Sequence, residues 1–198
     1  MTAKQGYPRA RLDALTDGVF GVAMTLLVLD VRFPDVVQAM TEHEIATTLV
    51  NMLPKLLPYF ISFFALGFHW LGLIKVRTHH EYVGRHYATW TLVDLFFVTF
   101  LPLSSTVVGR YSDEPAAIWL YSANIAVLAL LALVTIAGSS DVQRDHHARE
   151  RIAAAVLLLA SAALAALASF FAARHALWAY ALNAFAPVAF RAKGQDES

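Results

Sequence analysis

The sequence predicts an all-α integral membrane protein with six transmembrane helices in each subunit. Of its 198 residues, 58% are hydrophobic and only 15% are charged, whereas a soluble domain usually carries about 25% charged residues. The apolar residues form long runs and the charges lie between them, as is typical of chains that cross a bilayer. We therefore expect one transmembrane domain over residues 1–198, in the cell membrane, without an appended soluble domain.

Six apolar segments account for the predicted spans, because about 20 residues at 1.5 Å each cross a hydrocarbon core of about 30 Å. They are expected at about 15–33, 56–74, 87–108, 116–137, 152–173 and 176–190. Pro34 closes the first, and Pro58 lies at the start of the second, where a first helical turn tolerates proline. The third contains Pro102, and the fifth is almost entirely Ala and Leu. The sixth is short and interrupted by Asn183 and Pro187, so it could be tilted, interfacial or packed inside the protein.

The distribution of lysine and arginine predicts that both termini are cytoplasmic. With the N-terminus inside, the inner side carries Lys4, Arg9, Arg11, Lys75, Arg77, Arg85, Arg144, Arg149, Arg151, Arg191 and Lys193. The outer side carries only Arg32, Lys55, Arg110 and Arg174. Positive residues accumulate on the cytoplasmic side of membrane proteins, and an even number of spans agrees with this orientation.

The first predicted helix has two different faces. At about 100° per residue, Val22, Leu26 and Leu29 form a narrow aliphatic stripe, and Thr25 borders it. Asp13 and Asp17 lie on the opposite side. Two carboxylates four residues apart repel each other unless a cation is near, so we expect this side to be paired inside the protein. The stripe would then face either a symmetry axis or lipid, and the residues alone do not distinguish these two alternatives.

Two motifs carry a resemblance to a known family. Arg11-x-x-x-Leu15-Thr16-Asp17-Gly18 resembles the Arg-x-x-x-Phe-Ser-Asp signature of the bacterial transmembrane protein 175 family, prokaryotic relatives of the lysosomal potassium channel. Leu15 replaces the aromatic residue, and Thr16 replaces the serine while it keeps the hydroxyl.

The second motif lies in the third segment. The run from Trp90 through Asp94 to Pro102 resembles a Trp-x-x-x-Asn run of the same family that ends in Leu-Pro. Asp94 stands where asparagine is more usual, so its charge must be protonated, paired or hydrated. In the second segment Trp70 fits the family, whereas Leu73 stands where histidine is common.

The resemblance implies a homotetramer in which four first helices surround a central cation pathway. Val22, Leu26 and Leu29 would form stacked rings at its constriction, with the Thr25 hydroxyl beside them. Such rings offer no ligand to replace hydration water, so a narrow ring would gate by dewetting. The resemblance assigns Arg11, Thr16, Asp17, Trp70, Trp90 and Asp94 to a network that packs the helices.

The leading hypothesis is a passive, potassium-permeable cation channel whose partners are its own copies, lipid and monovalent cations. The alternative is a proton channel or proton-coupled transporter, because Asp13, Asp17, His69 and Asp94 lie in or near the membrane. We find no nucleophile–base pair, metal motif or phosphate loop and so expect no enzyme activity, no bound metal and no cofactor beyond permeant K⁺. With a net charge of zero and no basic stripe, no nucleic acid partner is expected.

Overall fold

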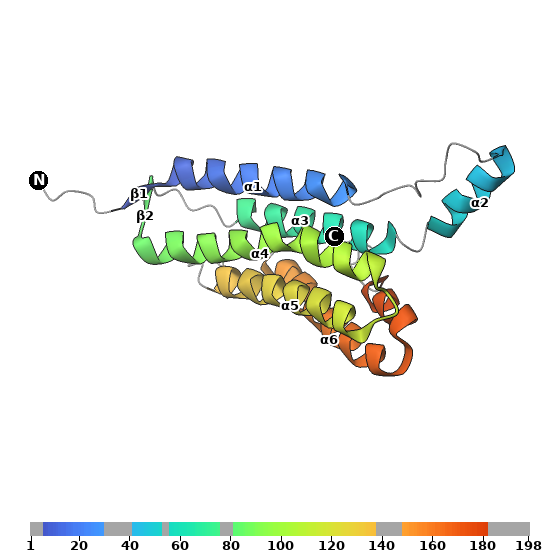
Figure 1. The fold of residues 1–198 in the computed structure, drawn as a ribbon. Coiled ribbons are helices and arrows are strands. Elements are labelled where there is room, and N and C mark those ends of the chain that lie inside the picture. The colour runs from blue at the N-terminus through green and yellow to red at the C-terminus, as the bar shows by residue number, and fades with distance from the viewer. Residues whose placement is uncertain (1–5, 30–40, 53–55, 76–80, 138–147, 182–198) are drawn as a thin grey trace, which may run out of the picture.

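The computed structural model describes residues 6–29, 41–52, 56–75, 81–137 and 148–181 (Figure 1). Within these ranges, five helices are long and apolar enough to cross a membrane. They are α1 (Arg9–Leu29), α3 (Leu57–Lys75), α4 (Arg85–Arg110), α5 (Pro115–Ala137) and α6 (Ala148–Ala176). Figure 1 shows them side by side, with α1 along one edge of the bundle and α5 and α6 on the other. A multi-pass membrane protein follows from these five helices.

The described residues match five of the six predicted spans, and the sixth is not confirmed. Most of segment 176–190 lies outside the described residues; its described start is the end of α6 and a 3₁₀ turn, η3 (Leu177–Ala181). The turn follows a break in α6 at Ala172, whose backbone (φ −153°, ψ 73°) is not helical. The first span begins at Arg9 rather than near Leu15, so the charged turn is part of the helix.

The stretch between the first two predicted spans contains a helix, α2 (Glu42–Met52), that was not expected. It begins with a capping box, in which the Thr41 amide and hydroxyl both donate to Oε2 of Glu44, at 2.7 and 2.8 Å. These two donors hold the pKa of Glu44 below its ordinary value of about 4.5. Figure 1 places α2 beyond the end of the bundle where α1 ends.

A short strand pair joins the starts of two helices. β1 (Tyr7–Pro8) pairs antiparallel with β2 (Tyr82–Val83), and the Arg9 amide donates to the Glu81 carbonyl at 3.0 Å. Gly6 lies so close that a Cβ there would come within 3.0 Å of the Val83 carbonyl oxygen. Because β1 leads into α1 and β2 leads into α4, the pair fixes the first turns of both helices at one end of the bundle.

The core is one cluster of apolar side chains shared by α1, α3, α4, α5 and α6. Hydrogen bonds between side chains also connect the helices at bilayer depth, where few competing partners exist. These bonds are Ser62–Tyr121 (2.9 Å), Tyr180–Ser122 (3.0 Å), Asn124–Ser104 (3.2 Å) and Trp119–Ser169 (2.8 Å). The cluster and these bonds together set the position of each helix against its neighbours.

Candidate functional site

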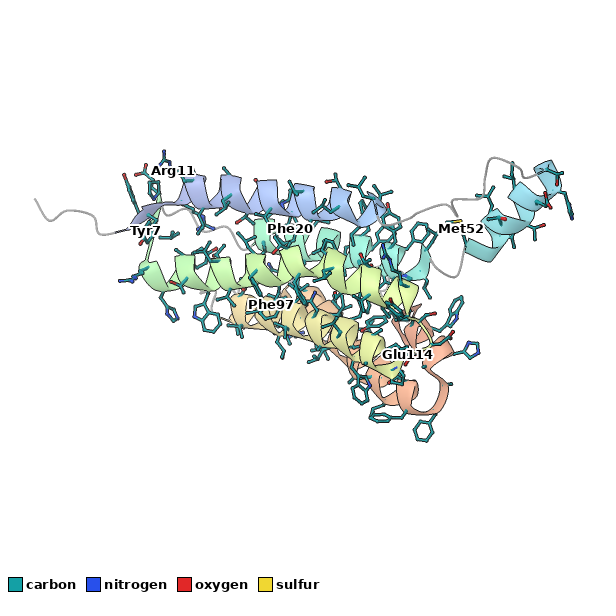
Figure 2. The ribbon with its side chains drawn as sticks, in the orientation of Figure 1. Tyr7, Arg11, Phe20, Met52, Phe97 and Glu114 are labelled. Atoms are coloured by element: carbon teal, nitrogen blue, oxygen red, sulfur yellow. The ribbon has the colours of Figure 1, made fainter. Side chains whose placement is uncertain are left out.

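The structure separates the two faces of α1 as the sequence predicted. Thr16, Phe20, Ala23 and Leu27 are buried against the other helices. The aliphatic stripe on the opposite side is open to the surroundings: Val22 is 59%, Leu26 44% and Leu29 69% exposed. Figure 2 shows Phe20 directed from α1 toward the bundle and Arg11 directed away from it. One face therefore anchors the helix, and the other is free to meet a second copy or lipid.

Thr25 borders the stripe and is also exposed. Its hydroxyl donates to the Val22 carbonyl of its own helix at 2.8 Å. The hydroxyl proton is thereby occupied, and the oxygen lone pairs remain as acceptors beside the stripe. Thr25 can thus offer a polar atom to a hydrated cation, which the aliphatic residues cannot.

Asp17 joins α1 to α3. The indole N–H of Trp70 donates to its Oδ1 at 2.9 Å, so two residues of the predicted network are brought together. Thr16 is buried, and its hydroxyl donates to the Leu12 carbonyl of the same helix at 2.9 Å. The Asp17–Trp70 bond fastens α1 on the side away from the stripe.

Asp94 is buried on α4 and meets a histidine of α3 that the sequence analysis placed in or near the membrane. Nε2 of His69 lies 2.9 Å from Oδ1 and 3.1 Å from Oδ2 of Asp94. The imidazole ring also lies against Phe20 of α1, with ring centroids 5.7 Å apart and an angle of 23° between the planes. The added charge at Asp94 is therefore paired, and the pair touches the anchored face of α1.

Arg9 is an anchor that the sequence analysis missed, because the family motif begins at Arg11. The Arg9 side chain is buried, its Nε lies 3.6 Å from Asp13, and its guanidinium lies 5.8 Å from the Tyr87 ring centroid. Helical spacing could have found it, since Arg9 is four residues before Asp13 and seven before the buried Thr16. Arg9 thus supplies a cation beside Asp13, whereas Asp17 accepts from Trp70.

Two members of the predicted network are placed differently. The Arg11 side chain is exposed, at the N-terminal end of the same side of α1 as the stripe. Trp90 is exposed, and its Nε1 donates to Nε2 of His86 on its own helix at 2.8 Å. Within one chain both side chains lie on outer helix surfaces, and their part in the packing network stays a prediction.

The described residues contain no group of three or more His, Cys, Asp or Glu side chains that could hold a metal ion. The stripe offers only alkyl groups and one hydroxyl, and the polar anchor is already paired within the bundle. This arrangement suits a surface that surrounds or excludes water.

Comparison with known proteins finds a family match over part of the chain. Residues 11–102 match the model of a family described as "Endosomal/lysosomal potassium channel TMEM175". This range contains the stripe, Asp17, the His69–Asp94 pair and both sequence motifs. The predicted resemblance to the TMEM175 family is confirmed.

Relatives of the TMEM175 type carry two different names. A protein named "Potassium channel" from Chamaesiphon minutus is 26% identical over 130 residues, which are 63% of this chain and 61% of that protein. "Endosomal/lysosomal proton channel TMEM175" from Danio rerio is 32% identical over 101 residues, which are 48% of this chain and 19% of that protein. The match thus spans less than two thirds of either relative's length.

The fold has a solved counterpart in the crystal structure of a lysosomal potassium-selective channel TMEM175 homolog from Chamaesiphon minutus. The TM-score is 0.73 at 18% identity, over 90% of this chain and 96% of that one. The helical arrangement of this chain is therefore similar to that of the homolog, and the similarity extends beyond residue 102.

Proposed function

We propose that the chain forms a homotetrameric, potassium-permeable cation channel in which four copies of α1 surround the pathway. The observation that carries this proposal is the exposed aliphatic stripe, on the side of α1 opposite three anchoring contacts. Val22, Leu26 and Leu29 are exposed. Behind them, α1 is held by Trp70 and His69 of α3 and by its own Arg9, whose guanidinium lies 5.8 Å from the Tyr87 ring centroid of α4. A helix fixed on one side with a regular apolar face on the other is suited to line a symmetry axis.

In this tetramer the stripe forms stacked rings that close the pathway by excluding water. A cation cannot shed its hydration shell against alkyl groups, because nothing replaces the lost ligands. Conduction therefore needs wider, partly hydrated rings, and selectivity for K⁺ over Na⁺ follows from the lower cost of dehydrating K⁺. Arg11 lies at the inner end of this face, and we assign it a carboxylate partner on a neighbouring subunit, since four unpaired guanidinium groups would repel cations.

Reconstitution tests the proposal. Purified protein is placed in liposomes under a K⁺ gradient, and its subunit number is measured by light scattering in detergent. We expect tetramers and a K⁺ flux that does not need valinomycin. Folded tetramers without flux, or monomers with flux, would contradict the proposed pathway.

A second candidate function is proton conduction, favoured by the His69–Asp94 pair within the bundle and by the relatives named as proton channels. The same liposomes distinguish it. A flux that follows a pH gradient and ignores the K⁺ gradient would support this function and exclude the first.

We also propose that both termini are cytoplasmic. The end of the bundle where α1, α4 and α6 begin carries Arg9, Arg11, Arg85, Arg149 and Arg151 among the described residues. Cytoplasmic ends attract such residues. Because the chain has no cysteine, a single cysteine introduced at residue 2 or at residue 113 can be labelled from one side of intact cells. Labelling of residue 113 alone from outside is expected.

A further inference from the structure

The first two turns of α4 extend beyond the neighbouring helices. Figure 1 shows them reaching further than the adjacent ends of α3 and α5, beside the strand pair. Among residues 85–90 only Ala88 is buried, and the other side chains are exposed. α4 has 26 residues, which at about 1.5 Å each reach about 39 Å, more than a hydrocarbon core of about 30 Å.

The extra length falls at the start of α4. At the other end of the helix, Arg110 and Tyr111 are exposed and mark a polar boundary. Trp90 lies about 30 Å from Arg110 along the helix, at about 1.5 Å per residue. Trp90 is therefore at the opposite edge of a hydrocarbon core, where tryptophan and tyrosine are enriched. Arg85 lies about 8 Å further out, at the depth of lipid headgroups.

The exposed side of these turns combines a cation with aromatic rings and hydrogen-bond donors. At about 100° per residue, His86 and Trp90 lie opposite the buried Ala88, and Arg85 lies beside them. The Trp90 indole N–H donates to Nε2 of His86 at 2.8 Å, so a neutral His86 carries its proton on Nδ1, where it remains a donor. Tyr82 of β2 is also exposed and adds a phenol hydroxyl.

The charge of Arg85 is not neutralised by the described part of the chain. Arg9, at the same end of the bundle, lies 3.6 Å from Asp13, whereas no described side chain pairs with Arg85. α4 carries no acidic residue between Arg85 and Asp94. Glu81 is the nearest carboxylate in the sequence, but it precedes β2 and does not pair with Arg85. An anion from outside the chain therefore fits this position.

We propose that Arg85, His86 and Trp90 form a binding site for the headgroup of an anionic phospholipid. The lipid phosphate accepts from the Arg85 guanidinium, whose parallel N–H groups match phosphate geometry, and from Nδ1–H of His86. The Trp90 ring lies beside the glycerol and the first methylene groups. Anionic lipids are concentrated in the cytoplasmic leaflet, and the proposed orientation puts this end of the bundle there. The site goes beyond the channel function and does not require it.

Tryptophan fluorescence tests the site. Protein in a neutral detergent is titrated with phosphatidylglycerol brominated on its acyl chains and, in parallel, with brominated phosphatidylcholine, because bromine quenches nearby indole rings. Half of the quenching should need about fivefold less phosphatidylglycerol than phosphatidylcholine, since one basic residue near an anionic surface contributes about 1 kcal/mol. Arg85→Gln should lose this preference, and Arg85→Lys should keep most of it because the charge remains.

Arg110→Gln is the matched control, since Arg110 is an exposed arginine at the other end of the same helix. It should keep the wild-type preference. Trp90→Phe should lose the part of the quenching that depends on phosphatidylglycerol, because Trp90 is the reporting ring. Equal quenching of the wild type by the two lipids would overturn the site. A preference that persists in Arg85→Gln, or that disappears equally in Arg110→Gln, would also overturn it.

Inorganic phosphate distinguishes a lipid from a free anion as the occupant. An excess of phosphate at constant ionic strength should leave the quenching by phosphatidylglycerol in place, because phosphate lacks the apolar contact with Trp90. Full competition by phosphate would overturn the lipid as the ligand. None of these measurements needs K⁺ flux, so they decide the lipid site even if the channel proposal fails.

Discussion

The indole N–H of Trp70 donates a 2.9 Å hydrogen bond to the carboxylate of Asp17, which connects α3 to α1 on the side opposite Val22 and Leu26. Asp17 sits in the first motif of the TMEM175 resemblance, and Trp70 is the residue of the second segment that fits the family. The bond therefore connects these two separate parts of the sequence in the folded chain. It sets the rotation of α1, and the rotation decides which residues face away from the bundle.

Replacing Trp70 with phenylalanine should loosen this connection. The ring packing is largely kept and the donor is lost, so we expect the fold to lose about 1 kcal/mol of stability and the K⁺ flux to change. Denaturant unfolding in detergent measures the first effect. Trp178→Phe is the control, since Trp178 is exposed in η3, and it should be neutral. If both variants behave alike, the Asp17 contact does not position α1.

Leu26→Ser should raise the basal K⁺ flux several-fold. A hydroxyl in the ring lowers the cost of holding water there and removes the dry barrier. Leu103→Ser is the matched control, because Leu103 is also exposed (53%, against 44% for Leu26) but lies on α4. An equal increase in both variants would show that the leak comes from general destabilisation.

Gly18 tests whether copies of α1 approach each other. Within one chain, a Cβ at Gly18 or at Gly72 would meet nothing within 4 Å, and alanine favours a helix by about 1 kcal/mol over glycine. Gly18 lies on the stripe side of α1, so Gly18→Ala should alter tetramer stability or flux in the proposed channel. Gly72→Ala on α3 should leave both unchanged. Identical behaviour of the two variants would place Gly18 against lipid.

The capping box of α2 predicts a pH effect outside the membrane. Because the folded pKa of Glu44 lies below its ordinary value, the cap stabilises α2 above about pH 4.5, the unfolded value, and this contribution is lost as the pH falls through the lower, folded pKa. Amide NMR shifts of residues 42–46 should therefore move toward coil values at acid pH. In Glu44→Gln they should change little over the same range, and a matching acid transition in that variant would contradict the assignment.

The sequence alone determined the five apolar helices and the two faces of α1. Length and hydropathy report transmembrane helices directly, and the 3.6-residue period placed Val22, Leu26 and Leu29 opposite Asp13 and Asp17 before any fold was known. The capping box at the start of α2 is also a local feature, because Thr41 and Glu44 are three residues apart. This spacing could have predicted α2 from the sequence. Each of these features depends on residues within a few turns of each other.

Only the tertiary structure decided which side chains meet. Asp94 required a partner, but its pairing with His69 depends on the rotation and axial position of α3 against α4, which packing of the shared core sets. The contact of Trp70 with Asp17 depends on packing in the same way. The burial of Arg9 rather than Arg11 follows from the strand pair, because that pair fixes the first turn of α1. Helix periodicity is a property of one segment, whereas contacts between helices depend on the energy of the whole bundle.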